Sequence, residues 1–269
     1  MPKRVAFLGP EGTYAEQAAL HLAKLEELTN TELISCNGLR SVVDHAASGI
    51  CKFAVIPVEN SVEGGVTASL DALWSHPELS IRRALVLPIQ HCLFSGGQIS
   101  DISEVLSHPQ ALAQCSSWLT KNLPNALQLP TSSTADAVKM IKGSKFRAAI
   151  ASRNPTIENG LNELAFPIND VPGNRTRFLL LERCEPGISG DLSSIAFSLH
   201  ANSPGALLEA LSCIAQLGLN MSRIESRPSK RALGEYVFFV DVELPASGAD
   251  GVLTKLEKHI SPLCEHLAN

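Results

Sequence analysis

Residues 53–74 read FAVIPVENSVEGGVTASLDALW and contain the three parts that decide the fold: a strand, a polar turn and a helix. Phe53–Val58 is a short, almost uninterrupted apolar run, which is typical of a strand buried on both faces of a sheet. Glu59–Ser61 is a polar turn, and Gly65–Trp74 is the predicted helix that follows it. A buried strand that leads through a turn into a helix is the repeating unit of an α/β fold.

The same alternation runs through the first 182 residues. The predicted strands are 5–8, 33–36, 53–58, 81–87, 90–94, 105–107, 127–129, 148–151 and 177–182. The predicted helices are 14–28, 39–47, 65–74, 110–122 and 134–142. This order predicts an α/β fold with a largely parallel sheet. Such sheets bind ligands beyond the carboxyl ends of their strands, where the polar turns Gly9–Thr13, Glu59–Ser61 and His108–Gln110 fall.

A second pattern begins after a stretch without hydrophobic periodicity. Residues 184–191 (CEPGISGD) are rich in turn formers and are interpreted as a linker. Beyond them the predicted strands are 193–200, 219–226 and 234–244, and the predicted helices are 204–217 and 249–259. This order, βαββα, lacks one strand of a ferredoxin-like βαββαβ module. The missing strand would have to come from residues 261–269.

Length, charge and cysteine content exclude several classes of protein. A chain of 269 residues, 45% hydrophobic and 18% charged, predicts one large or two medium folded domains and no disorder. The net charge of −5 and the lack of a basic run argue against nucleic acid as the main partner. Seven scattered cysteines without a CxxC pair predict reduced thiols and a cytoplasmic protein. No apolar run is long enough for a signal peptide or a membrane span.

Several polar motifs are candidate ligand sites, and each has a purely structural alternative. Glu59–Ser61 is either a capping turn or a group of hydrogen-bonding side chains at the end of a strand. Gln110 either begins a helix or binds a ligand at that helix start. In the second half, Gly205–Leu207 and Glu225–Pro228 either form a small pocket together or are separately a cap and a turn.

Residues 173–178 (GNRTRF) form the most informative motif of the first part. Arg175 and Arg177 flank Thr176 at the start of an apolar strand. A guanidinium group recognises carboxylates through paired hydrogen bonds, so the motif predicts an anion site, with a solvated surface turn as the alternative. The sequence has no HExxH, Cys/His cluster, GxSxG, P-loop or dinucleotide fingerprint, and therefore predicts no metal and no nucleotide cofactor.

Six motifs, taken in order, resemble the prephenate dehydratase family with a C-terminal ACT regulatory domain. They are GPEGTY (9–14), VIPVENSVEGGV (55–66), SHPQAL (107–112), NRTRF (174–178), GAL (205–207) and ESRP (225–228). The resemblance implies an α/β fold with a two-lobed, periplasmic-binding-protein-like catalytic region and a ferredoxin-like βαββαβ ACT domain. The implied boundaries are a catalytic domain at 1–183 (first lobe about 1–77 and 166–183, second lobe about 78–165), a linker at 184–191 and an ACT domain at 192–269.

The resemblance also implies an enzyme, a carbon–oxygen lyase of L-phenylalanine biosynthesis that needs no cofactor or metal. It would convert prephenate to phenylpyruvate, a loss of carbon dioxide and hydroxide that aromatisation drives. Thr176 would be the essential hydroxyl, acting on the departing hydroxyl by placement because threonine is a very weak acid. Arg177 would pair with a substrate carboxylate and Phe178 would shape the ring pocket. The implied substrate-binding set is Asn60, Ser61, Gln110, Arg177, Phe178, Thr13 and Gly12.

The implied effector is L-phenylalanine, bound at an ACT dimer interface of a cytoplasmic homodimer or homotetramer. The implied effector-binding residues are Gly205, Ala206, Leu207, Asn220, Glu225, Ser226, Arg227 and Pro228. Two alternatives stay open: an arogenate dehydratase, which would convert arogenate to phenylalanine, and a non-catalytic amino-acid-sensing or solute-binding protein. The polar C-terminal stretch PLCEHLAN (262–269) also leaves open whether the last ACT strand forms.

Overall fold

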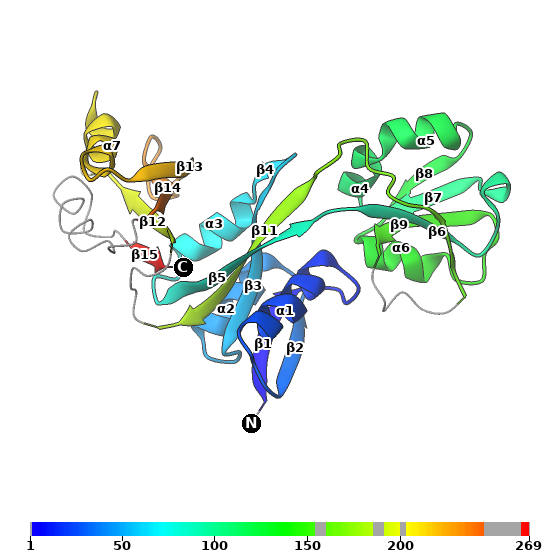
Figure 1. Cartoon of the computed structure of the whole chain (residues 1–269), viewed down its shortest axis with the longest axis horizontal. Coiled ribbons are helices and arrows are strands. Elements are labelled where there is room, and N and C mark those ends of the chain that lie inside the picture. The colour runs from blue at the N-terminus through cyan, green and yellow to red at the C-terminus, as the bar shows by residue number, and fades with distance from the viewer. Residues whose placement is uncertain (1, 154–159, 185–190, 200–202, 245–264, 269) are drawn as a thin grey trace.

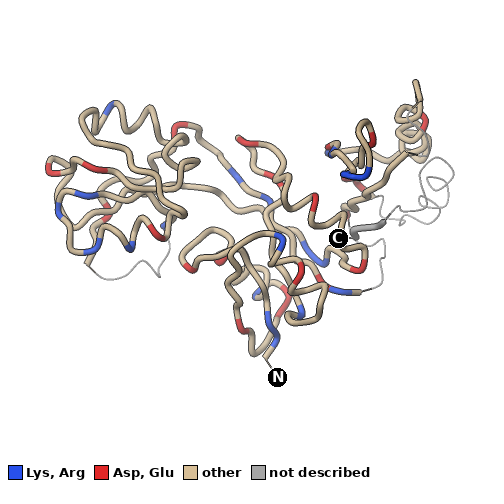
Figure 2. Tube along the Cα trace, turned by 180° about the vertical axis from the view of Figure 1, so that it is seen from behind, with Lys and Arg blue, Asp and Glu red and all other residues tan. Residues whose placement is uncertain are grey.

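The computed structural model describes residues 2–153, 160–184, 191–199, 203–244 and 265–268, which form three β-sheets with helices against them (Figure 1). The helix predicted at 249–259 lies outside the described residues. Basic and acidic residues are interspersed along the chain trace (Figure 2). None of the helices within the described ranges has the length and hydrophobicity of a membrane span.

The first sheet contains strands from the beginning and the end of the region before residue 184. Its order is β2 (Thr31–Cys36), β1 (Lys3–Leu8), β3 (Phe53–Asn60), β11 (Arg175–Arg183) and β5 (Leu79–Pro88), with β4 (Gly64–Gly65) paired to β3. β1 is parallel to β2 and β3, whereas β11 is antiparallel to both of its neighbours. The sheet is therefore mixed, and the prediction of a largely parallel sheet is only half right, because the chain returns to this sheet from the opposite end.

Helices cover both faces of the first sheet, which explains its continuous apolar strands. α1 (Tyr14–Leu25) packs on one face, in a core that includes Phe178 and Leu180 of β11. α2 (Leu39–Ala47) and α3 (Thr67–Trp74) cover the other face, with Leu179 and Leu181. Successive residues of β11 thus point to opposite cores, as the two-residue period of a strand requires.

The second sheet forms the other lobe. Its order is β10 (Asn162–Ala165), β6 (His91–Ser95), β9 (Arg147–Ser152), β7 (Glu104–Ser107) and β8 (Leu127–Pro130). The helices are the 3-10 turn Ile99–Asp101, α4 (Pro109–Gln114), α5 (Ser116–Asn122) and α6 (Thr134–Met140). β10 is short and polar and was not predicted.

The single helix predicted at 110–122 is two helices. The chain turns at Cys115, where φ is −120° and ψ is 11°. The carboxylate of Asp170 accepts hydrogen bonds from the backbone N–H groups of Ser117 (2.8 Å) and Trp118 (2.9 Å), and so satisfies the free donors at the start of α5. Asp170, which is distant in sequence, therefore stabilises the end of α4, where its N–H donates to the Gln114 carbonyl, and the start of α5.

The expected lobe boundaries also need correction. β5 pairs with β11 from Leu79 to Pro88, so the first lobe continues past residue 77, and the chain crosses to the second lobe near Ile89. On the return, Ile168 packs in the core of the second lobe and its N–H bonds to the carbonyl of His91, so that lobe continues past residue 165. An apolar run predicts a strand but does not indicate which sheet the strand joins.

The C-terminal domain is a four-stranded antiparallel sheet with the order β13 (Asn220–Pro228), β14 (Tyr236–Glu243), β12 (Leu192–Ser198) and β15 (Glu265–Ala268). β15 supplies the last strand that the sequence left open. One face packs on α7 (Ala206–Gln216). The opposite face packs on α3 through Leu70 and Trp74, so α3 lies between the first sheet and the C-terminal sheet (Figure 1). This strand order is the one expected of a ferredoxin-like module.

Candidate active site

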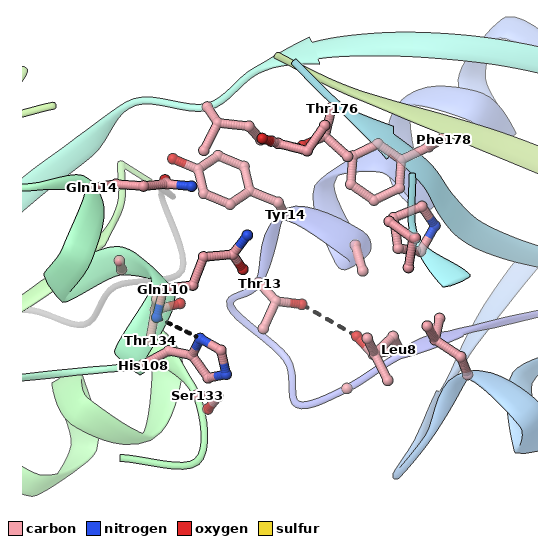
Figure 3. A pocket seen from close by; sticks show the side chains of 18 of the residues that line it. Leu8, Thr13, Tyr14, His108, Gln110, Gln114, Ser133, Thr134, Thr176 and Phe178 are labelled. Carbon is pink, nitrogen blue, oxygen red and sulfur yellow. Dashed lines mark hydrogen bonds between the residues drawn. The ribbon is translucent and has the colours of Figure 1, made fainter. Parts of the chain in front are cut away.

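A cavity of about 360 Å³ lies between the two lobes. Its first-lobe wall is formed by the ends of β1 and β3, the beginning of β11 and the start of α1, and its second-lobe wall by the starts of α4 and α6 (Figure 3). Five residues of the predicted site line this cavity: Thr13, Asn60, Gln110, Thr176 and Phe178. The topology thus gathers residues more than 160 positions apart at one edge of the first sheet.

Thr176 and Asn60 are directly opposite each other on β11 and β3. The Asn60 Oδ1 atom accepts hydrogen bonds from the N–H groups of Val62 (2.9 Å) and Glu63 (3.0 Å), which fixes the orientation of the amide. Asn60 Nδ2 must therefore donate to Thr176 Oγ1, 2.8 Å away. The Thr176 hydroxyl makes no second hydrogen bond to a described residue. Its hydroxyl hydrogen is consequently free to be donated into the cavity.

The orientation of Asn60 determines the direction of a longer hydrogen-bond network. Asn60 Nδ2 also donates to Asn174 Oδ1 (2.9 Å), and Asn174 Nδ2 donates to Gln114 Oε1 (3.1 Å). The same oxygen lies 2.9 Å from His91 Nε2, which must therefore carry a hydrogen. Gln114 Nε2 in turn donates to Glu63 (3.3 Å). The network joins the two lobes, because Gln114 and His91 belong to the second.

His91 is held as a neutral imidazole. The side chain is 3% exposed, and burial lowers its pKa, against a smaller opposing effect of the hydrogen bond to Gln114. Its Nδ1 atom is buried and has no hydrogen-bond partner among the described residues. Protonation would place a second N–H at this atom, where no described acceptor is available.

The second-lobe wall offers neutral polar groups. His108 Nδ1 accepts the N–H of Gln110 at 3.3 Å and caps α4, which leaves Nε2 as the ring nitrogen that can donate. Ser133 caps α6 by accepting the N–H of Asp136 (3.0 Å), and the Ser132 hydroxyl donates to the Asp136 carboxylate (2.6 Å). The Gln110 side chain makes no hydrogen bond to a described residue and projects towards the cavity (Figure 3).

The remaining wall is apolar and the lining carries no full charge. Leu8, Pro57, Ile89 and Phe178 are among the apolar lining residues. Of the described residues that line the cavity, none is Lys, Arg, Asp or Glu. In the described ranges, no three His, Cys, Asp or Glu side chains come together in a group suited to a metal ion. An anionic ligand would therefore be met by neutral hydrogen-bond donors.

The prediction that Arg177 pairs with a substrate carboxylate is wrong for this structure. Arg177 lies between Thr176 and Phe178 on one strand, so its side chain points to the opposite face. There it forms ion pairs with Asp241 of the C-terminal domain and with Glu59 (3.2 Å). Three consecutive residues of a regular strand cannot all face one cavity.

Gly12 and Ser61 are near the cavity but do not line it. The Gly12 N–H donates to Glu16 (2.7 Å), and its carbonyl accepts from Ser152 of the second lobe (3.2 Å). The amide predicted to bind substrate is therefore already engaged. The Ser61 hydroxyl accepts the N–H of Arg175 (2.9 Å) and thereby holds the turn after β3 against β11.

Sequence analysis did not assign a role to several residues that build the site. Tyr14 lines the cavity, and its hydroxyl accepts the N–H of Gln90 (2.9 Å) and donates to the Gln90 carbonyl. Burial raises the pKa of Tyr14, so it remains a neutral phenol. Asn174 lies inside the NRTRF motif, and Gln114 follows Gln110 by one helical turn. The sequence therefore contained a signal for both residues as members of the site. His91 has no local signal in the sequence.

Of the predicted effector residues, three lie at the start of α7 and the other five lie along β13. Gly205 adopts a left-handed conformation (φ 91°) as the N-cap of α7, which Ala206 and Leu207 begin. Asn220 donates to Glu243 (2.9 Å). Glu225 instead pairs with Arg223 (2.7 Å).

Arg227 pairs with both carboxylate oxygens of Asp71 on α3 (3.1 and 3.2 Å). The predicted role of Glu225 and Arg227 as effector ligands is therefore not supported: their side chains are directed towards the catalytic lobe.

Comparison with known proteins gives a consistent result. A family model described as prephenate dehydratase matches residues 5–186. The chain is 35% identical over 265 residues to the prephenate dehydratase of Methanocaldococcus jannaschii, covering 96% of this chain and 95% of that one. It is 37% identical over 242 residues to the bifunctional chorismate mutase/prephenate dehydratase of Aquifex aeolicus, covering 89% of this chain and 65%, about two thirds, of that protein.

Among solved structures, prephenate dehydratase from Arthrobacter aurescens in complex with L-Phe is similar along almost the whole chain. The TM-score is 0.85 and the identity 37%, and the match covers 98% of this chain and 88% of that one. The family model alone spans more than half of the chain, and the described fold and cavity match the expected two-lobed architecture. The chain therefore belongs to the prephenate dehydratase family.

Proposed function

We propose that this protein is a prephenate dehydratase, a hydro-lyase that converts prephenate to phenylpyruvate. One observation carries the proposal: Asn60 donates to Thr176, so the threonine hydrogen is available to a ligand in the interlobe cavity. Prephenate carries a hydroxyl at C4 of a non-aromatic ring, and this hydroxyl must leave. A hydroxyl that is fixed as a hydrogen-bond donor suits that requirement.

The reaction requires one carbon–carbon and one carbon–oxygen bond to break. The ring carboxylate leaves as carbon dioxide, and its bonding electron pair enters the ring, aromatises it and expels the C4 oxygen. That oxygen leaves with its hydrogen as hydroxide, which takes up one proton from the solvent and becomes water. Thr176 would stabilise the charge that develops on the oxygen by donating a hydrogen bond, with the Asn60 amide holding it in place. Phe178 and Leu8 would contact the ring.

The uncharged lining suits the decarboxylation. A cation beside the ring carboxylate would stabilise it in the ground state and lose that interaction as the charge moves into the ring. Because catalysis depends on binding the transition state more tightly than the substrate, such a cation would slow the step. The Gln110 side chain and His108 Nε2 are the donors that we propose for the substrate oxygens.

The direct test is incubation with prephenate while phenylpyruvate formation is followed. Thr176→Ala should lower kcat about 100- to 1,000-fold, the usual loss for one preorganised donor. Thr176→Ser should retain most activity because it keeps the hydroxyl. A folded wild-type protein without turnover would refute the proposal, and prephenate binding without product would favour a non-catalytic binding protein.

The main alternative substrate is arogenate, which has an ammonium group where prephenate has a ketone. The described lining offers no carboxylate to pair with that ammonium, and this supports prephenate as the substrate. The ratio of kcat/KM for the two substrates decides between them. A higher kcat/KM for arogenate would identify an arogenate dehydratase.

We further propose that the C-terminal domain is an ACT domain that binds L-phenylalanine and regulates activity. Its ferredoxin-like strand order and the L-Phe named with the Arthrobacter structure support this. The proposed ligand residues are those not engaged with the catalytic lobe: Gly205, Ala206, Leu207, Asn220, Ser226 and Pro228.

We also propose that assembly is through β13, which lies at the edge of its sheet, and that the location is cytoplasmic, which the free cysteines among the described residues support. Light scattering with and without phenylalanine tests the assembly. A monomer under both conditions would contradict it.

A further inference from the structure

One face of β11 lines the cavity, and the opposite face contacts the C-terminal domain. Thr176 faces the cavity opposite Asn60, and the next residue, Arg177, faces the C-terminal domain opposite Glu59. The two cross-strand pairs are adjacent on the same two strands. Any force on the Arg177–Glu59 pair therefore acts on backbone that is one residue from Thr176 and Asn60.

Arg177 is held in a buried ionic cluster at the domain boundary. Its Nη2 atom pairs with Asp241 of β14 and lies 3.2 Å from Glu59. Asp241, which is 2% exposed, also accepts a hydrogen bond from Ser194 (2.6 Å). Arg223 of β13 lies 3.9 Å from Asp241 and 4.0 Å from Glu59. The cluster thus joins three strands of the C-terminal domain to two strands of the catalytic lobe.

Little solvent reaches the Arg177–Asp241 pair, although the Glu59 side chain is exposed. A cavity of only about 10 Å³ is lined by Arg177, Ser194, Arg223 and Asp241, among others, and the Arg177 Nε atom is buried without a partner among the described residues. Removal of Asp241 would leave Arg177 with Glu59 as its acidic partner and would remove the most buried member of the cluster, which is unfavourable. The Arg177–Asp241 pair is therefore held much more firmly than an ion pair on the surface.

The backbone of β3 is irregular opposite this point. Arg177 faces Glu59 and Phe178 faces Pro57, so β3 has one extra residue, Val58, which forms a β-bulge, while β11 stays in register with β5 from Arg175 to Leu180. A bulge locally disrupts the ladder and redirects side chains, and bulges are over-represented beside active sites. The bulge therefore separates the Thr176–Asn60 and Arg177–Glu59 pairs from the ladder that continues at Phe178–Pro57.

A second contact from the C-terminal domain reaches the turn between β3 and β4. The Glu225 carboxylate lies against Gly65 of β4, where an added Cβ atom would overlap it. β4 pairs with Glu59 and Asn60. The C-terminal domain therefore contacts β11 through Asp241 and the β3–β4 turn through Glu225.

We propose that Arg177 is a positioning residue, through which Asp241 of the C-terminal domain fixes the placement of the Thr176 hydroxyl. The inference rests on the proposed function. It assigns the C-terminal domain a direct role in basal activity, and it gives an effector bound there a physical route to the cavity: a change in the position of β14 would move Asp241, then Arg177 and the strand that carries Thr176.

The test compares Asp241→Asn with Asp71→Asn. Both variants remove the carboxylate of an interdomain ion pair. Asp71 lies on α3 and pairs with Arg227 of β13, and none of the α3 residues Thr67–Trp74 lines the cavity. We expect Asp241→Asn to lower kcat about 100-fold, the loss that a small misplacement of reacting groups causes, with KM unchanged because Arg177 does not contact substrate. Asp71→Asn should leave kcat unchanged.

A double-mutant cycle tests whether the pair acts as a unit. Arg177→Gln should reproduce the loss of Asp241→Asn, the double variant should lose no more than either single variant, and Arg177→Lys should recover part of the activity. In the variants that break the pair, the change in kcat that L-phenylalanine causes should also disappear. Circular dichroism and thermal melting check folding, and Arg177→Lys remains informative if Asp241→Asn does not fold.

The outcomes separate the two proposals. If wild type converts prephenate but Asp241→Asn and Arg177→Lys keep its kcat and its response to phenylalanine, the positioning role is refuted and the proposed function stands. Equal losses of kcat in Asp71→Asn and Asp241→Asn would also refute it, because a general weakening of the contact between the domains would then explain the loss. A wild-type protein without turnover would overturn both.

Discussion

The Asn60 side chain decides what Thr176 can do. Two backbone N–H groups from the turn after β3 hold the amide oxygen, and the amide nitrogen is thereby left to donate to the threonine. Because a hydroxyl has one hydrogen, this arrangement directs that hydrogen elsewhere. Asn60 therefore acts on Thr176, and it also lines the cavity, where its predicted role in substrate binding stays a prediction.

Asn60→Asp tests this orientation. One oxygen of the introduced carboxylate would still accept the two N–H groups, but the other could only accept, so Thr176 would donate to it instead of to the substrate. We expect kcat to fall about 100-fold or more, with a smaller change in KM. The exposed Asn162→Asp adds the same charge in the second lobe and is the control. An unchanged kcat in Asn60→Asp would contradict the assigned orientation.

His91 predicts a dependence of stability on pH. Burial lowers its pKa below the ordinary value of 6.5, so the unfolded chain takes up this proton first as the pH falls. The contribution of His91 to stability is therefore complete above about pH 6.5 and is lost as the pH falls towards the lowered pKa. We expect urea unfolding at pH 7.5 and at about pH 5 to show a larger loss of stability for wild type than for His91→Gln. Equal losses would show that His91 does not contribute.

At the scale of the element, β11 is covered on both faces. Its sequence RTRFLLLER is apolar at four consecutive positions, so hydrophobic alternation does not indicate which face meets which helix. The packing of α1 against Phe178 and Leu180, and of α2 and α3 against Leu179 and Leu181, sets this orientation. Once Phe178 faces the cavity, Thr176 must share that face and Arg177 must not.

The start of α5 gives a prediction of stability. Asp170 caps this helix from a distant segment, so Asp170→Ala should lower the free energy of unfolding by about 1 kcal/mol, as for other capping residues. Asp170→Asn keeps an acceptor oxygen and should lower it less. Chemical denaturation of the three proteins gives the comparison, and equal stability of wild type and Asp170→Ala would show that the cap contributes nothing.

At the scale of the whole molecule, the two lobes meet around the cavity through a small set of contacts. Tyr14 of the first lobe bonds to both backbone groups of Gln90, where the chain crosses between lobes. Ser152 of the second lobe accepts from Gln17 (3.1 Å) and donates to the Gly12 carbonyl. These contacts, with the Asn174–Gln114 bond, set the separation of the walls that Thr176 and Gln110 occupy.

Tyr14→Phe should loosen this junction. Loss of the hydroxyl removes two hydrogen bonds at the crossing strand and should cost about 1 kcal/mol of stability, since the exposed Gln90 can bond to water instead. Because lobe closure completes the site, we expect kcat and KM to change together. Small-angle X-ray scattering should give a larger radius of gyration than for wild type. Identical scattering and kinetics would show that Tyr14 does not hold the lobes together.

The sequence by itself determined the α/β class and the C-terminal βαββ order, and the motifs that carry the family resemblance indicated Thr176, Asn60 and Gln110, which line the cavity. These depend on local properties: the period of apolar residues, the turn formers and the spacing within a motif. The positions of most strands and helices were predicted for the same reason. The exceptions, β10 and the division of one helix at Cys115, depend on contacts with distant segments.

Only the tertiary structure decided which sheet β5 joins, which way Arg177 points and how the Asn60–Asn174–Gln114–His91 network is directed. Each of these depends on which segments pack against a strand that is apolar on both faces, and local sequence does not contain that information. The same packing reverses the expected role of Arg177. The cation predicted for the substrate binds the C-terminal domain, and the cavity wall is left to neutral donors.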